Sequence, residues 1–270
     1  MGLNSSSFSW GPQVTHFGRS TDHTALVFDN RGVGNSGYPR GPYTTAGMAE
    51  DVIALLDYLG WTKERDLHVV GISLGGMIAQ ELATRIPNRI ASLVLAVTTP
   101  GGRLWNNFPP WSGLASLARL MFIQDPAKKA GIISQMLFPK SWLDLKAEDD
   151  SAGRTNYQVQ NEEFIRRVAI TQPQRFIGHI SQMAAGLTHY CSSDRLRYIS
   201  SSIPKVVILT GDIDNLVLPA HSLELKASMP EAEYIQWTET GHGIHVQRKK
   251  QFNELLERVF REGQERSRQR

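Results

Sequence analysis

The feature that most constrains this chain is a serine bracketed by glycines at residues 71–75, which read GISLG. An apolar run over 67–72 leads into it, and apolar residues recur at helical spacing over 77–86 directly after it. The pattern predicts a strand, a sharp turn and a helix, with Ser73 at the turn. Glycine is needed two residues before and two residues after the serine, because a Cβ there would collide with the strand or the helix.

Such a turn has a chemical consequence for Ser73. The geometry lifts the serine hydroxyl above the sheet and points the first N–H groups of the following helix at whatever the serine attacks. A G-x-S-x-G sequence between a strand and a helix is typical of a nucleophile elbow. The sequence also arises by chance in glycine-rich chains, so the interpretation of Ser73 as a nucleophile depends on the flanking elements and on partner residues elsewhere.

Composition indicates one globular domain with an insertion. The chain has 270 residues, of which 41% are hydrophobic and 20% charged, and its net charge is +3. The basic excess lies mainly near the C-terminus, where it is typical of a solvated helix end, and no aromatic stacking residues accompany it, so we expect no nucleic-acid partner. No apolar run reaches the roughly 18 residues of a membrane span. We expect a soluble protein that acts on a small molecule.

Cysteine and histidine usage indicates neither a disulfide nor a metal site. Cys191 is the single cysteine, and no cysteine–histidine cluster has zinc spacing. The glycine-rich turn at 29–36 lacks the G-x-G-x-x-G spacing of a dinucleotide site. We therefore expect no metal and no cofactor. The N-terminus lacks the pattern of a signal peptide, and one cysteine fits a reducing compartment, so we expect a cytoplasmic protein that is a monomer or homodimer.

Strands and amphipathic helices alternate along much of the chain. Strands are expected at 24–29, 66–72, 90–97, 205–210 and 233–237. Helical patterns separate most of them, and the last helix has an apolar stripe at Phe252, Leu255, Leu256, Val259 and Phe260. The run over 90–97 is apolar throughout, which is typical of a parallel strand covered on both faces. The alternation predicts an α/β fold with a doubly wound, mostly parallel sheet.

The alternation stops between residues 99 and 203. Helical patterns follow one another near 114–123, 127–137, 162–170 and 176–187. About 100 residues of helix without a strand predict an inserted helical cap, so we expect a core of 1–98 and 204–270 and a cap of 99–203. Large apolar side chains are enriched there: Trp105, Phe108, Trp111, Met121, Phe122, Met136 and Phe138. They either pack the cap onto the core or line an apolar substrate pocket.

A serine hydroxyl becomes a good nucleophile only when a base takes its proton and a third group orients that base. The chain order here is Ser73, then an acid after a late strand, then a histidine after the last strand. His242 lies in a Gly-His-Gly turn directly after that strand, and His245 is the alternative base. Asp212 and Asp214 both follow the strand at 205–210 and are the candidate acids.

These segments together resemble the α/β-hydrolase family, in the branch of esterases, lactonases, haloperoxidase-like enzymes and carbon–carbon-bond hydrolases. The matching segments are 28–36, 71–75, 211–214 and 241–242. The family pattern Gly-x-x-Asp selects Asp214 as the acid that orients His242. The resemblance implies a serine hydrolase that cleaves an ester or related acyl bond of a small, largely apolar substrate through an acyl-enzyme. A carbon–carbon-bond hydrolase with the same triad, and a non-catalytic or truncated protein of this fold, are the alternatives.

The resemblance also implies an oxyanion hole made of two backbone N–H groups. One belongs to Leu74, the residue after the serine, and the other to a turn that follows the third strand of the family. Met1, Gly2 and Leu3 stand where that turn belongs, which makes the Leu3 N–H the second donor. Without a third strand, the segment at 24–29 and the elbow strand are left unbridged. We therefore expect the chain to be a shortened version of a longer protein, which intact-mass analysis would test.

Overall fold

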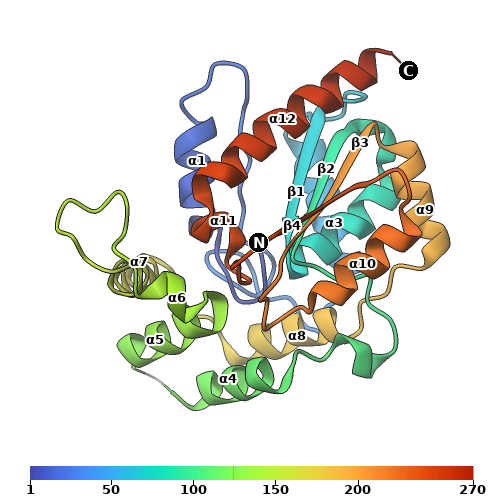
Figure 1. Cartoon of the computed structure of the whole chain (residues 1–270). Helices are drawn as coiled ribbons and strands as arrows, with labels where there is room; N and C mark the ends of the chain where they lie inside the picture. The colour runs from blue at the N-terminus through green and yellow to red at the C-terminus, as the bar shows by residue number, and fades with distance from the viewer. Residues whose placement is uncertain (124, 270) are drawn as a thin grey trace.

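A computed structural model describes residues 1–123 and 125–269, and the side chain of Met121 lies outside the described part. The described strands form one parallel sheet, shown in Figure 1. In order across the sheet they are β1 (Leu67–Ile72), β2 (Ile90–Ala96), β3 (Lys205–Gly211) and β4 (Glu233–Trp237). The two central strands, β2 and β3, are buried along their full length, as a strand covered on both faces must be.

Apolar helix faces cover both sides of the sheet. One core gathers side chains from α2 (Thr45–Tyr58), α3 (Leu74–Arg85), α9 (Ser193–Ser202) and α10 (Pro219–Ser228). The other core gathers them from α1 (Gly11–Phe17), α11 (Ile244–Gln247) and α12 (Lys249–Arg268). Figure 1 shows α12 on one side of the strands and α3, α9 and α10 on the other. The predicted α/β class with a doubly wound parallel sheet is confirmed.

The last helix, α12, has the predicted apolar stripe. Its five stripe residues, from Phe252 to Phe260, are all buried against the sheet. The outer face of the helix is rich in arginine and glutamate. The buried apolar stripe is therefore what attaches this helix to the sheet. No helix among residues 1–123 and 125–269 is both long enough and apolar enough to span a membrane.

The strand predicted at 24–29 is wrong. A strand exists only through hydrogen bonds to a neighbour, and in the described sheet β1 pairs with β2 alone. The segment at 24–29 has no such neighbour in the described residues, and Leu26 and Phe28 instead pack as partly buried side chains against the core under α2 and α3. Its apolar pattern therefore reflects packing and not pairing.

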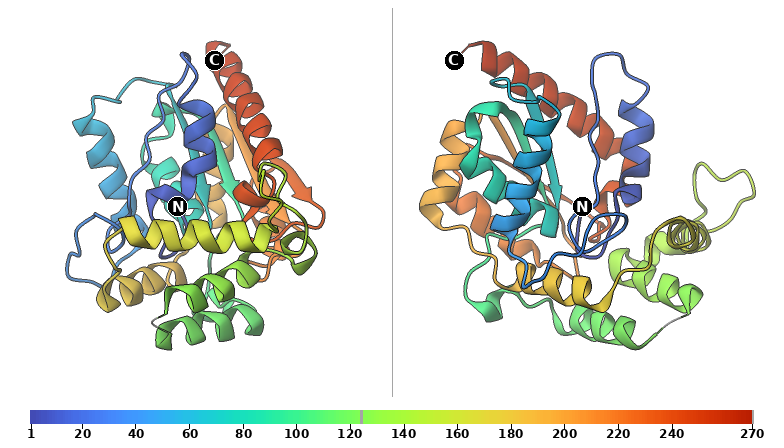
Figure 2. Two further views of the ribbon diagram at one scale, coloured as in Figure 1. Left: turned by 90° about the vertical axis from the view of Figure 1, so that its left-hand side faces the viewer. Right: turned by 180° about the vertical axis from the view of Figure 1, so that it is seen from behind.

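The described chain between β2 and β3 is mostly helical, and the loop over 144–155 is closed by an antiparallel bridge between Lys146 and Thr155. The elements are η3 (Leu104–Asn107), α4 (Trp111–Phe122), α5 (Pro126–Leu137), α6 (Lys140–Leu143), α7 (Asn156–Ile170), α8 (Phe176–Leu187) and α9. Figures 1 and 2 show α4 to α8 beyond the carboxyl ends of the strands. The helices η3, α6 and α9 were not expected from the sequence. The division into a core of 1–98 and 204–270 and a cap of 99–203 stays a prediction.

The aromatic residues of this helical region differ in burial. Phe138 is buried, whereas Trp105, Phe108, Trp111 and Phe122 are exposed, the last two by more than four fifths. Packing of the helices onto the core therefore accounts for Phe138 and not for the other four.

The two chain segments that enter and leave this helical region lie against each other. Gly101 and Tyr190 form an antiparallel bridge, and the Cys191 N–H donates to the Pro100 carbonyl at 2.8 Å. The buried amide of Gln80 on α3 donates to the Thr99 carbonyl at 2.9 Å. The entering segment is thereby fixed to α3, the helix that follows Ser73, and the leaving segment is fixed to the entering one.

Candidate active site

Ser73 sits at the junction of β1 and α3 in a conformation that L-residues rarely adopt. Its φ is 55° and its ψ is −121°. A Cβ on Gly71 would clash with the Gly75 carbonyl oxygen, and a Cβ on Gly75 would stand 2.9 Å from the carbonyl oxygen of Met1. The glycines on either side of the serine are therefore required by close backbone approach, as the elbow interpretation demands.

The neighbouring strand supports this turn from below. The Ser73 N–H donates to the Ala96 carbonyl at 3.0 Å, and the Thr98 hydroxyl donates to the Ser73 carbonyl at 2.8 Å. Gly76 lets α3 approach, since a Cβ there would lie 2.6 Å from Thr98 Cβ. Thr98 was not among the site residues predicted from the sequence. The available signal was its position directly after an uninterrupted apolar strand.

His242 and Asp214 form a buried pair. The His242 Nδ1 and the Asp214 Oδ2 lie 2.7 Å apart, and the side chains are 7% and 0% exposed. The other carboxylate oxygen of Asp214 accepts the N–H groups of Leu216 at 2.8 Å and Val217 at 3.0 Å. The carboxylate is thus fixed on one side by its own turn, which leaves Oδ2 to orient the imidazole through Nδ1.

The alternative acid and base have other partners. Asp212 accepts the backbone N–H of Thr240 at 3.1 Å, which ties the turn after β3 to the turn after β4. His245 Nε2 lies 3.3 Å from the Ser9 carbonyl, and burial lowers the pKa of His245 to about 3. Asp214 and His242 therefore contact each other, whereas Asp212 and His245 each contact a backbone group.

The turn that carries His242 doubles back over the end of the sheet. The Ile213 N–H donates to the Thr240 carbonyl at 3.2 Å, so the chain after β4 crosses above β3. Figure 1 shows α11, which follows this turn, close to the N-terminus. The structure records no hydrogen bond between Ser73 and His242 among the described residues. It brings His242 and Asp214 together and presents Ser73 at the same edge of the sheet.

The first residues of the chain lie on the elbow. A Cβ on Gly2 would stand 3.3 Å from Ser73 Cβ and 3.7 Å from Ser73 Oγ, and Leu3 packs against the core cluster that contains Leu74. No acceptor in the described part of the chain takes the backbone N–H of Leu3 or Leu74. The absence of other acceptors in the described residues is consistent with the predicted role of these two N–H groups, which stays a prediction.

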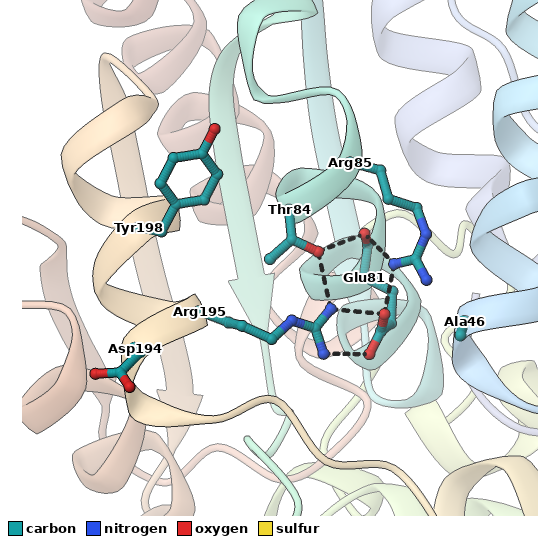
Figure 3. Close-up of a pocket in the computed structure, with 7 residues that line it drawn as sticks. All are labelled: Ala46, Glu81, Thr84, Arg85, Asp194, Arg195 and Tyr198. Atoms are coloured by element: carbon teal, nitrogen blue, oxygen red, sulfur yellow. Dashed lines mark hydrogen bonds and ion pairs between the residues drawn. The ribbon is translucent and has the colours of Figure 1, made fainter.

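A hollow of about 750 Å³ lies elsewhere, between α3 and α9 (Figure 3). Its lining is dominated by Glu81, which sits between Arg85 and Arg195 and pairs with both. Arg85 also pairs with Glu50 at 2.6 Å, so both arginines have carboxylate partners. The pair of Glu81 with Arg195 joins α3 to α9 beside this hollow. In the described part of the chain, no three His, Cys, Asp or Glu side chains come together as a metal site requires.

The alpha/beta hydrolase fold family model matches residues 2–249. The chain belongs to the α/β-hydrolase family. The match covers the elbow, the acid turn and the histidine turn, so these elements lie within the family's common framework. The protein is accordingly an α/β-hydrolase-type enzyme.

Curated relatives of this α/β-hydrolase include several proteins named "Putative carbamate hydrolase RutD". The one from Caulobacter segnis is 28% identical over 94% of this chain and 87% of its own length. The one from Agrobacterium fabrum is 29% identical over 94% of this chain and 88% of its own length. These similarities support hydrolytic activity.

Solved structures share the fold. A hydrolase from Pseudomonas aeruginosa PA01 is 24% identical with a TM-score of 0.68, covering 94% of this chain and 84% of its own. The enol-lactonase from Burkholderia xenovorans LB400 is 21% identical with a TM-score of 0.69, covering 96% and 88%. At these identities the likeness concerns the fold alone.

Proposed function

We propose that this α/β-hydrolase is a serine hydrolase in which Ser73, His242 and Asp214 form the catalytic triad. The observation that carries the proposal is the buried 2.7 Å contact of His242 Nδ1 with Asp214 Oδ2, at the sheet edge where the strained Ser73 turn presents its hydroxyl. A base oriented through Nδ1 has Nε2 left for the serine proton.

The reaction would proceed in two displacements. The Ser73 Oγ attacks the acyl carbonyl while its proton passes to His242 Nε2, and the imidazolium then gives that proton to the leaving group. Water, deprotonated by His242, attacks the acyl-enzyme and releases the acid and the free serine. The N–H groups of Leu74 and Leu3 would receive the carbonyl oxygen as its negative charge develops. Asp214 keeps the Nδ1–H in place without taking the proton.

The substrate class we propose is an ester or a related acyl compound. A carbamate carbonyl can be attacked in the same way, and the names of the RutD relatives make carbamates a second class to examine. The exposed aromatic side chains Trp105, Phe108 and Trp111 support a substrate with apolar parts, because core packing does not account for them.

Labelling with a fluorophosphonate probe tests the proposal. The wild-type protein should be labelled at Ser73, and Ser73→Ala should abolish the label. The matched control is Ser193→Ala, which removes an exposed serine from α9 and should leave labelling unchanged. Labelling that persists in Ser73→Ala, or that is absent from a folded wild-type protein, would refute the assignment of the nucleophile.

A further inference from the structure

Helix α8 carries a buried glutamine on the face that it turns towards the core. The side chain of Gln182 is 1% exposed. Its Oε1 accepts the backbone N–H of Asn4 at 2.9 Å, and its Nε2 donates to the carbonyl of Arg31 at 2.8 Å. A buried amide needs partners for both its oxygen and its nitrogen, and this one has them on two segments far away in the sequence.

The two partners fix the orientation of the Gln182 side chain. One partner is an N–H group and the other a carbonyl, so only one of the two orientations of the amide satisfies both. Arg31 is itself held, because its guanidinium pairs with Asp51 on α2 at 2.5 Å. A second side chain of α8 also contacts the first residues, since the Asn4 Nδ2 lies 2.7 Å from the His179 Nδ1. Helix α8 thus holds Asn4 by its backbone and by its side chain.

Asn4 belongs to a tight turn that also contains the expected oxyanion donor Leu3. The Ser5 N–H donates to the Gly2 carbonyl at 3.3 Å, which makes Leu3 and Asn4 the two central residues of the turn. The φ of Asn4 is 58°, and a positive φ at this position is typical of a type II turn, where asparagine is tolerated. Rotation of the peptide between Leu3 and Asn4 would convert the turn to another type and shift Leu3.

The backbone of this turn sets the direction of the Leu3 N–H. The Gly2 carbonyl and the Leu3 N–H belong to one planar trans peptide, so they point in opposite directions. The bond from Ser5 fixes the first of these peptides, and the bond to Gln182 fixes the next one. The turn lies beside the nucleophile, because a Cβ on Gly2 would stand 3.7 Å from the Ser73 Oγ.

The same helix reaches the residue that carries the other expected donor. Gly186 lies one helical turn after Gln182, and a Cβ on Gly186 would stand 3.9 Å from the Leu74 Cδ1. Figure 1 shows α8 beyond the carboxyl ends of the strands, below the N-terminus. Helix α8 therefore packs over both residues whose N–H groups are expected to form the oxyanion hole.

We propose that Gln182 is a positioning residue for the oxyanion hole, and that its Oε1 holds the peptide between Leu3 and Asn4 so that the Leu3 N–H stays directed at the developing oxyanion. The proposal rests on the proposed function and adds a residue of the inserted helical region to its machinery. Gln182 acts through the backbone of the turn. Donors held in advance stabilise charge that develops only in the transition state, so the effect belongs to kcat and not to KM.

Steady-state kinetics on 4-nitrophenyl butyrate test this role. Gln182→Met keeps the size of the side chain and removes both hydrogen bonds. It should lower kcat by about 10- to 100-fold and leave KM within about twofold. Gln182→Glu keeps an oxygen for the Asn4 N–H and should recover much of the lost kcat. Gln80→Met is the matched control, because Gln80 is equally buried but donates to the Thr99 carbonyl, and its kcat should stay within about threefold of the wild type.

A transition-state analogue gives a readout that a loss of packing would not change. Butylboronic acid forms a tetrahedral adduct with a serine hydroxyl, in which a boron-bound oxygen takes the place of the oxyanion. Its inhibition constant should rise in Gln182→Met by about the factor by which kcat/KM falls. The Asn4 N–H should also exchange with solvent faster in Gln182→Met, measured by NMR, and not in Gln80→Met.

The outcomes separate this proposal from the proposed reaction. Equal losses of kcat in Gln182→Met and Gln80→Met, a loss confined to KM, an unchanged boronate affinity, or unchanged exchange of the Asn4 N–H would overturn the role of Gln182. A folded wild-type protein that neither hydrolyses esters nor reacts with the fluorophosphonate probe would instead refute the reaction. Exchange at Asn4 would still decide in that case whether Gln182 holds the turn.

Discussion

The guanidinium of Arg195 donates to both carboxylate oxygens of Glu81, from Nη1 to Oε1 at 3.0 Å and from Nη2 to Oε2 at 2.7 Å. Glu81 belongs to α3, which begins at the proposed nucleophile, and Arg195 belongs to α9, which leads out of the helical region into β3. The pair therefore joins the helix of the reaction centre to the end of the region that covers it (Figure 3).

Glu81→Gln should destabilise the protein by about 2 kcal/mol, because it leaves Arg85 and Arg195 without their shared, buried partner. Urea unfolding at neutral pH measures the change. Glu50→Gln removes a largely exposed partner of Arg85 and should cost no more than about 0.5 kcal/mol. Equal effects of the two variants would contradict the stabilising role of Glu81 as the buried partner of both arginines.

Asp214→Asn should lower kcat by about three to four orders of magnitude, because the amide no longer favours the tautomer with Nδ1–H and cannot stabilise the imidazolium. Steady-state kinetics on a 4-nitrophenyl ester measure it. Asp212→Asn keeps an oxygen acceptor for the Thr240 N–H and should retain most of the activity. A larger loss in Asp212→Asn than in Asp214→Asn would reverse the assignment of the acid.

Gly71→Ala should be strongly destabilising, by at least about 2 kcal/mol, because the added Cβ meets backbone atoms of Gly75 and Gly76 that cannot move independently. Gly37→Ala is the matched control, since no heavy atom outside its immediate neighbours lies within 4 Å of the added Cβ. Its free energy of unfolding should stay within about 0.5 kcal/mol of the wild type. Similar stabilities for the two variants would argue against the tight elbow.

Stability should fall as the solution is acidified from about pH 6.5 towards pH 4. Burial lowers the pKa of His189 to about 4, and its Nδ1 lies 2.9 Å from the Thr45 hydroxyl. The unfolded chain then binds the proton more readily than the native protein, so the stabilisation is complete above the unfolded pKa and is lost as pH falls. The effect amounts to about 2 to 3 kcal/mol.

Denaturant unfolding at a series of pH values checks this expectation. His189→Gln should flatten the dependence between about pH 6.5 and pH 4, whatever it does to stability at neutral pH. His68 and His245, whose pKa values burial lowers to about 4 and about 3, act in the same direction and keep part of the slope. An unchanged slope in His189→Gln would show that its proton is not linked to folding.

The sequence pattern predicted correctly those strands and helices whose apolar residues are regularly spaced within one segment. The apolar run of β2 and the stripe of α12 are of this kind, because one strand or helix carries the whole signal. The strand expected at 24–29 depended on a neighbouring strand, which no periodicity can supply. Helix α9 was missed because its sequence, SDRLRYISSS, is mostly polar and has few apolar positions.

The candidate site divides in the same way. Spacing and chain order selected Ser73 and His242, and the resemblance to the family selected Asp214 over Asp212. The geometry pairs His242 with Asp214 directly. The structure was needed to find Thr98 beneath the elbow, because its significance comes from its hydrogen bond to the Ser73 carbonyl. The roles of Leu3 and Leu74 as oxyanion donors stay predictions.

The pairing of Gly101 with Tyr190 makes the intervening segment interchangeable in principle. Its two ends meet at one place, where the buried amide of Gln80 holds Thr99 and the Cys191 N–H bonds to the Pro100 carbonyl. A short turn could therefore join the ends without disturbing the strands. Insertions, deletions or wholesale replacement between these two residues would then change which molecules reach the serine while the sheet beneath stays the same. In evolutionary terms, selectivity could diverge rapidly on this scaffold at little cost to folding.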